Sequence, residues 1–254
     1  MTKIIMHGCN GHMGQTITGI VEGTEDASIV AGIDLTGEMK NGYPVFKSLD
    51  ECDVEADVII DFSSAKAIDG LLDHCERTHM PLVLCTTGLD EAQLKRVEEV
   101  SKTTPLLRSA NMSLGINTLF RLLEAAANVL VPAGFDMEIV EKHHNKKVDA
   151  PSGTAIALAD VLKSVAGDDY HYVYDRSQVR EKRDPKEIGL SAVRGGTIVG
   201  EHEVFFAGED EVITIKHTAY SKAVFGKGAV EAAVFLADKA PGLYNMQDVI
   251  AARM

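Results

Sequence analysis

A glycine-rich turn near the N-terminus is the feature that most restricts how this chain can fold. An apolar run from Lys3 to His7 leads into the segment Gly8 to Gly14, with glycines at every third position, and apolar residues at helical spacing follow. Strand, glycine turn and helix in this order are typical of a dinucleotide-binding sheet, where glycine permits the tight turn and the close approach of a pyrophosphate. Amides at the helix start would hold the phosphates. A purely structural turn is the alternative interpretation.

An aspartate after the second apolar run strengthens the dinucleotide interpretation. The strand expected from Ser28 to Ile33 ends at Asp34, about twenty residues after the last glycine, where a carboxylate can accept hydrogen bonds from the adenosine ribose. A strand-end aspartate in an ordinary turn is the alternative. Leu35 follows, and no nearby arginine is available for a 2′-phosphate, so we expect NADH to serve at least as well as NADPH.

Strands and helices continue to alternate up to about residue 112. This pattern predicts a doubly wound parallel sheet with ligands at the carboxyl ends of its strands. Three turn segments at such ends are expected to line the cofactor cleft, although turn residues without a ligand would look the same. They are Asp61, Phe62 and Ser63; Cys85, Thr86, Thr87 and Gly88; and Ser109, Ala110, Asn111 and Met112.

The second half of the chain has a different pattern. Helices are expected over residues 114–131 and 155–165, with a strand over 135–140 between them. The character changes at Tyr170, and after a charged stretch from Asp175 to Glu187, β-rich segments separated by turn residues predict an open mixed sheet. Its apolar face would need cover, which identical sheets of other subunits would supply. The expected fold class is therefore α/β, with a Rossmann-type doubly wound parallel sheet domain and an α+β domain containing an open mixed sheet.

Composition excludes several classes of protein. The formal net charge of −13 argues against a nucleic-acid surface, and no apolar run approaches the roughly 18 residues of a membrane span. Four cysteines show neither CxxC pairs nor zinc spacing, so we expect reduced thiols and no metal site. The first residues leave no room for an apolar signal core. A cytoplasmic location follows as an expectation.

The stretch from Glu141 to Ala155 concentrates groups suited to chemistry. It contains His143, His144 and two lysines, and a Ser-Gly-Thr turn then opens a helix. Cations and helix-start amides in an acidic protein suit a substrate with more than one carboxylate, and basic groups beside a hydride donor can supply the accompanying proton. Structural histidines and a solvated run of charge are the alternatives.

The same stretch resembles a known signature. Residues 141–155 follow E-x-H-H-x-x-K-x-D-A-P-S-G-T-A position by position, which is the pattern of the dihydrodipicolinate reductase family. The resemblance extends over essentially the whole chain. It implies NADH- or NADPH-dependent reduction of 4-hydroxy-tetrahydrodipicolinate, a small cyclic dicarboxylate, to tetrahydrodipicolinate in diaminopimelate and lysine biosynthesis. It also implies a homotetramer built through the mixed sheet.

The resemblance assigns roles to individual residues. His143 and Lys147 would be the catalytic proton carriers, and substrate would be held by His144, Ser152, Gly153 and Thr154. Residues 1–112 and 221–254 would form the dinucleotide-binding domain, and 113–220 the substrate-binding and oligomerisation domain. The implied cofactor residues are Gly8, Cys9, Asn10, Gly11, His12, Met13, Asp34, Cys85, Thr86, Thr87, Ser109, Ala110, Asn111 and Met112.

Three residues depart from the family pattern. His12 replaces a common arginine in the glycine turn, Leu35 stands where some members have arginine, and Cys85 occupies a position often held by glycine. The first two weaken the case for strong NADPH selectivity. Two other functions fit the same scaffold: a dehydrogenase of another small dicarboxylate, and a non-catalytic NAD-binding regulatory protein.

Overall fold

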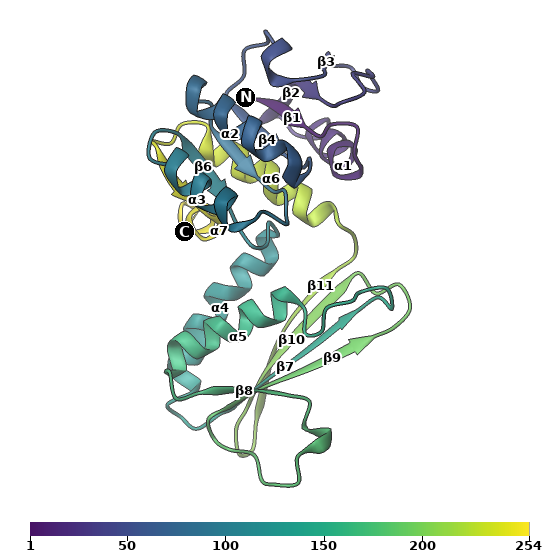
Figure 1. Cartoon of the computed structure of the whole chain (residues 1–254). Helices are drawn as coiled ribbons and strands as arrows, with labels where there is room; N and C mark the ends of the chain where they lie inside the picture. Colours follow the sequence, from purple (N-terminus) through teal and green to yellow (C-terminus); the bar gives the residue numbers. More distant parts are fainter. Residues whose placement is uncertain (254) are drawn as a thin grey trace. The chain divides into compact units, whose positions relative to one another are not determined.

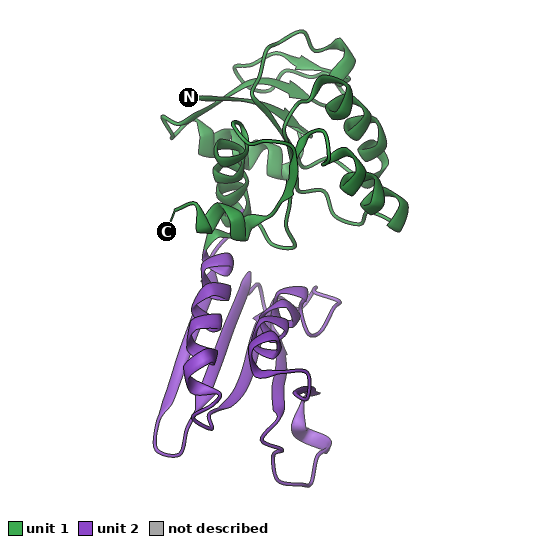
Figure 2. Ribbon diagram, turned by 90° about the vertical axis from the view of Figure 1, so that its left-hand side faces the viewer, with its two compact units in different colours: residues 1–114, 223–254 green, residues 115–222 purple. Residues whose placement is uncertain are grey.

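The chain forms two compact units (Figures 1 and 2). The structure is a computed structural model that describes residues 1–253. Unit 1 contains residues 1–114 together with the chain from Ala223 onward, and unit 2 contains residues 115–222. The C-terminal segment therefore completes the unit in which the chain begins.

Unit 1 is built on a seven-stranded sheet in which every pairing is parallel. The strand order reverses beside β1, because β2 and β3 lie on one side of it and β4 on the other. Such a reversal places ligand sites at the carboxyl ends of the strands. In spatial order the strands are β12 (Gly242–Tyr244), β6 (Pro105–Arg108), β5 (Leu82–Leu84), β4 (Val58–Asp61), β1 (Thr2–His7), β2 (Ala27–Ile33) and β3 (Val45–Phe46).

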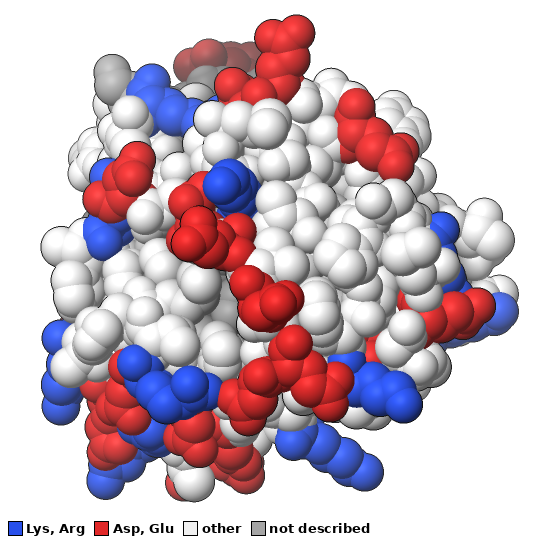
Figure 3. Space-filling view, turned by 90° about the horizontal axis from the view of Figure 1, so that it is seen from above, with Lys and Arg blue, Asp and Glu red and all other residues white. Residues whose placement is uncertain are grey.

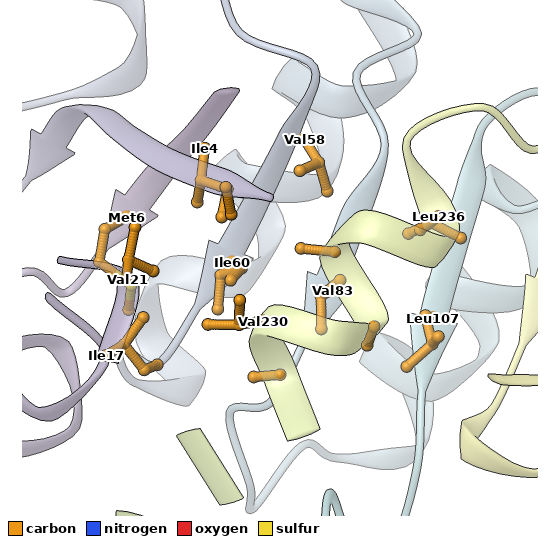
Figure 4. Close-up of a cluster of buried hydrophobic side chains, with 14 of the residues drawn as sticks. Ile4, Met6, Ile17, Val21, Val58, Ile60, Val83, Leu107, Val230 and Leu236 are labelled. Atoms are coloured by element: carbon orange, nitrogen blue, oxygen red, sulfur yellow. The ribbon is translucent and has the colours of Figure 1, made fainter. Parts of the chain in front are cut away.

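Helices cover both faces of this sheet. Alternation along β1 sends Ile4 to one core and Ile5 to the other. Figure 4 shows the first core, where Val230 and Leu236 of a C-terminal helix pack beside Ile60 and other strand residues. That core includes α1 (His12–Val21), α6 (Ala223–Leu236) and α7 (Met246–Ala251), and the opposite one includes α2 (Ile68–Thr78) and α3 (Glu91–Val100).

Unit 2 packs two helices against one face of a five-stranded mixed sheet (Figure 1). The central strand β7 (Asp136–His143) pairs in parallel with β9 (Glu187–Arg194) and antiparallel with β10 (Gly200–Ala207). The outer strands are β8 (His171–Tyr174) and β11 (Val212–Ala219), and the helices are α4 (Leu114–Leu130) and α5 (Gly153–Ala166). Three short 3₁₀ helices complete the chain: η1 (Leu49–Glu51), η2 (Ala65–Ala67) and η3 (Arg176–Gln178).

The expected fold class is confirmed, with two differences in detail. Three short strands were not expected, namely β3, β8 and β12, and β7 runs three residues beyond Val140 to His143. The apolar face of the mixed sheet is covered within the chain by α4 and α5. The expectation that other subunits cover that face is therefore wrong.

The surface carries the excess of acidic residues that the sequence implies. Figure 3 shows acidic side chains in a broken band across the face seen from above, with basic side chains dispersed beside them. Among the described residues, no helix has the length and apolar character that crossing a membrane requires.

A glycine in α6 makes the packing of unit 1 testable. A Cβ at Gly228 would lie 1.7 Å from the carbonyl oxygen of Met112, whereas a Cβ at Gly70 of α2 would meet nothing within 4 Å. We expect Gly228→Ala to lower the free energy of unfolding by about 2 kcal/mol through overpacking. Gly70→Ala should raise it by about 0.5 kcal/mol, because alanine favours a helix. Urea denaturation checks both values, and equal effects would contradict the packing.

Candidate functional sites

The glycine turn of unit 1 is required by sterics. Gly8 has a φ of 81°, and a Cβ there would lie 2.7 Å from the carbonyl oxygen of Phe62. A Cβ at Gly14 would lie 2.3 Å from the carbonyl oxygen of Gly8. Helix α1 starts just after Gly11, which offers no side chain to cap its amides. The first amides of α1 thus remain for an anion.

The carboxyl ends of β1, β2 and β4 surround a cavity of about 250 Å³. Asp34 lines it and accepts hydrogen bonds from the backbone N–H (3.0 Å) and the hydroxyl (2.7 Å) of Thr36. Burial alone would raise the pKa of Asp34, but bonds from Thr36 and Asn10 outweigh it and hold that pKa below its ordinary value. The lining residues are His7, Gly8, Gly11, Ile33, Asp34, Leu35, Lys47, Phe62, Ser63, Ser64 and Ala67.

A buried carboxylate shapes the turn after β4. Asp61 is fully buried, and its Oδ1 atom bonds His7 Nδ1 at 2.8 Å and the Ser63 hydroxyl at 2.6 Å. Its Oδ2 atom has no hydrogen-bond partner among the described residues. The sequence singled out this turn, and the structure places Phe62 and Ser63 in the cavity wall.

The other expected cofactor residues lie outside the lining of this cavity. The Cys9 side chain is buried in the core, where burial raises the pKa of its thiol to about 11. Cys85 donates its backbone N–H to the Asp61 carbonyl at 3.0 Å, and burial raises the pKa of its thiol well above the usual value. The remaining residues outside the lining are Asn10, His12, Met13, Thr86, Thr87, Ser109, Ala110, Asn111 and Met112.

Strand β7 contains the first residues of the stretch from Glu141 to Ala155 and directs two of their side chains inward. Glu141 and His143 both face the helix-covered side, and Lys142 between them faces the other side. Glu141 is 1% exposed, and its carboxylate accepts two bonds from Arg194 (2.6 and 2.8 Å), one from His143 Nδ1 (2.5 Å) and one from the Ser152 backbone (2.9 Å). Burial opposes ionisation, but these donors prevail and keep the pKa of Glu141 below its ordinary value.

The bond to Glu141 fixes how His143 is presented. A carboxylate only accepts, so Nδ1 of His143 carries the proton in that bond, and Nε2 points toward Gly200. A Cβ at Gly200 would lie 3.1 Å from Nε2, so glycine leaves room for the ring. The His143 ring packs edge-on against His202 at a centroid distance of 5.2 Å.

His202 is a second buried histidine of this site. It is 4% exposed, and its Nε2 atom lies 3.1 Å from the hydroxyl of Ser152, which also accepts the backbone N–H of Ala155. Burial first, and then the charge of His143, lower the pKa of His202 to about 4. The ring is therefore neutral at neutral pH.

The second part of the stretch turns back toward the helix start. Lys147 pairs with Asp149 at 2.9 Å and is partly buried, whereas Lys146 is exposed. The Nδ1 atom of His144 is buried without a hydrogen-bond partner among the described residues. Helix α5 begins at Gly153, with Ser152 as its N-cap. The positive end of its dipole thus lies in the same segment as Lys147.

Sequence reasoning assigned no role to Arg194 or to the Glu141 carboxylate, although both hold the site together. Arg194 opens an Arg-Gly-Gly turn, and this turn was the only local signal. Over residues 1–253 no group of three or more His, Cys, Asp or Glu is arranged to hold a metal ion.

Comparison with known proteins decides the family. The profile described as "Dihydrodipicolinate reductase, N-terminus" matches residues 2–112, and "Dihydrodipicolinate reductase, C-terminus" matches residues 115–250. The chain belongs to the dihydrodipicolinate reductase family. Within this family it is 52% identical to the 4-hydroxy-tetrahydrodipicolinate reductase of Caldanaerobacter subterraneus subsp. tengcongensis, and 48% to that of Clostridium novyi, with 98% of both chains covered each time.

A solved dihydrodipicolinate reductase has the same fold. The dipicolinate-bound enzyme from Paenisporosarcina sp. TG-14 superposes with a TM-score of 0.80 at 23% sequence identity, covering 98% of this chain and 99% of that one.

The buried His202 predicts a pH-dependent stability. Because its pKa is about 4 in the folded chain and about 6.5 in an unfolded one, only the unfolded state takes up a proton between these values. The free energy of unfolding is therefore highest above pH 6.5 and decreases as the pH falls from 6.5 toward 4. When the pH is lowered from 7 to 5, the free energy of unfolding of the wild type, measured by urea denaturation, should decrease by about 2 kcal/mol more than that of His202→Gln. His171→Gln, which changes an exposed histidine, should behave as the wild type. Equal losses in all three proteins would contradict this reasoning.

Proposed function

We propose that this chain is a 4-hydroxy-tetrahydrodipicolinate reductase, which uses NADH or NADPH to form tetrahydrodipicolinate in diaminopimelate and lysine biosynthesis. The observation that carries the proposal is the site on β7 and α5, in a chain 52% identical over 98% of its length to a relative of that name. The small dicarboxylate named in the dipicolinate-bound relative supports the substrate class.

The residues of unit 2 supply binding and protons in this proposal. The reaction adds a hydride and a proton to the substrate and releases its hydroxyl group as water, and the nicotinamide supplies the hydride. Lys147 is proposed as the acid, because its ammonium has three donor hydrogens, and His143 serves either as the acid or as electrostatic support. His144, Ser152, Gly153 and Thr154 are proposed to contact the substrate. The start of α5 suits one of its carboxylates.

The residues of unit 1 supply the cofactor site in this proposal. The amides at the start of α1 would hold the pyrophosphate, and Asp34 would accept hydrogen bonds from the adenosine ribose. The segments that follow β5 and β6 are proposed to line the rest of the site. They are Cys85, Thr86 and Thr87 after β5, and Ser109, Ala110, Asn111 and Met112 after β6. Asp34 followed by Leu35 supports the use of NADH at least as well as NADPH.

A coupled assay tests the reaction and both catalytic residues. With the upstream dehydratase present, the wild type should oxidise NADH and NADPH, measured separately by loss of absorbance. His143→Ala and Lys147→Ala should each lower kcat about 10²-fold, the effect typical of general acid catalysis. Lys146→Ala is the matched control and should retain wild-type activity, because that neighbour is exposed.

The assay separates two failures. If folded wild type oxidises neither nucleotide, the proposed function is wrong. If the reaction proceeds but both alanine variants stay within about 10-fold of the wild type, the function stands and the catalytic assignment is wrong.

The open face of the mixed sheet supports a proposed homotetramer. On that face Lys216 pairs with Glu201 and Glu203 at 2.9 Å each, and Lys142 also pairs with Glu203 at 2.9 Å. Val212, on the same face, is 60% exposed at the edge strand. The face combines apolar surface with balanced charge, which suits contact with a second copy of itself. A cytoplasmic location is also proposed, in keeping with four free cysteines.

Solution mass tests the assembly. Light scattering should give four times the chain mass of 27.4 kDa for the wild type. Lys216→Glu should lower the mass, because it places three like charges together on the proposed interface. Lys186→Glu, which reverses an exposed charge paired with Asp169, should not. A wild type of single-chain mass would remove the tetramer.

A further inference from the structure

The short strand β3 brings Lys47 beside Asp34. In the parallel pairing of β2 and β3, Ile33 is the register partner of Phe46, and Asp34 donates its backbone N–H to the Phe46 carbonyl at 3.0 Å. Asp34 and Lys47 are therefore the first residues beyond two neighbouring strands, whose spacing is about 4.8 Å. Both line the same cavity at the carboxyl end of the sheet. Lys47 lies thirteen positions after Asp34 in the sequence, so no local pattern reveals this.

The stem of Lys47 lies over the turn that follows Asp34. A Cβ at Gly37 would lie 3.1 Å from Cγ and 3.2 Å from Cε of Lys47, so glycine allows the side chain to cross there. Gly37 itself closes the turn by donating its N–H to the Asp34 carbonyl at 2.9 Å. The stem of Lys47 therefore crosses the turn that begins at Asp34.

The ammonium of Lys47 is not neutralised by the protein. Within residues 1–253, no carboxylate lies within ion-pair distance of its Nζ atom, whereas the nearby Lys40 pairs with Glu38 at 3.7 Å. No other lysine or arginine lines the cavity in the described part of the chain. The cavity wall thus contains one carboxylate, that of Asp34, and one cation, that of Lys47, without a carboxylate partner among the described residues.

These two charges match the difference between the two nicotinamide cofactors. NADPH carries a phosphate on the adenosine 2′-oxygen, where NADH carries a hydroxyl. A carboxylate accepts a hydrogen bond from the hydroxyl but repels the phosphate, whereas a cation attracts the phosphate. Leu35 gives the phosphate no donor side chain. We infer that Lys47 binds the 2′-phosphate of NADPH and so allows a site with Asp34 to accept both cofactors.

This inference rests on the proposed use of pyridine nucleotides but not on turnover, so binding tests it. Calorimetric titration of the full-length protein with NADPH and NADH gives Kd for each. Lys47→Gln should raise Kd for NADPH about 10-fold, equivalent to one charge-assisted contact of about 1.4 kcal/mol, and leave Kd for NADH within about 2-fold. Lys47→Glu should weaken NADPH further, because two carboxylates would then face the phosphate.

Three controls separate the phosphate contact from other effects. Lys40→Gln removes a neighbouring cation outside the cavity lining and should leave both Kd values unchanged. Titration with 2′,5′-ADP and with ADP should reproduce the NADPH and NADH results, which isolates the adenosine end. Raising the salt concentration should weaken NADPH binding to the wild type more than to Lys47→Gln.

The outcomes distinguish the inference from the proposed function. Unchanged Kd values in Lys47→Gln, or equal changes for both cofactors, would overturn the role of Lys47 and leave the reductase activity as proposed. A wild type that binds both nucleotides with the expected Lys47 dependence but reduces no substrate would overturn the activity alone. A wild type that binds neither nucleotide would overturn both.

Discussion

The carboxylate of Glu141 is the interaction on which the substrate unit depends. It receives Arg194 from β9, His143 from its own strand and the backbone of Ser152 at the start of α5. Arg194 also donates to the Asp149 carbonyl at 2.7 Å. One buried charge therefore ties together two strands, a loop and a helix start. Removing one partner of such a pair typically costs 3–5 kcal/mol, because the other charge stays buried.

The same carboxylate sets the chemical state of its neighbours. It holds the His143 proton on Nδ1, so that Nε2 is the atom left to exchange protons or to carry charge. His202 packs against that ring and stays neutral through burial, so it adds no buried charge beside Arg194. Groups fixed in this way need little rearrangement when a charged ligand binds.

Local patterns predicted the parts of the structure that depend on neighbours in sequence. The glycine turn, Asp34 and the alternation of strands and helices follow from spacing alone, and the structure has the expected fold class. Arg194 lies 53 residues from Glu141 and reaches it only through the pairing of β7 with β9. The strand was expected to end at Val140, but β7 continues through the charged residues that follow, to His143. Those charges are tolerated in the strand because they satisfy one another across the sheet, which no window of sequence can reveal.

Unit 1 uses a buried carboxylate differently. Asp61 directs His7 and Ser63 through one oxygen, and its other oxygen has no partner among the described residues. An unsatisfied buried acceptor costs about 1–3 kcal/mol, and this one belongs to the strand end that precedes two cavity-lining residues, Phe62 and Ser63. Glu141, by contrast, has both oxygens fully bonded. The saturated carboxylate gives unit 2 a fixed site, and the half-bonded one leaves unit 1 a buried acceptor at the end of β4, next to the strand where the sheet order reverses.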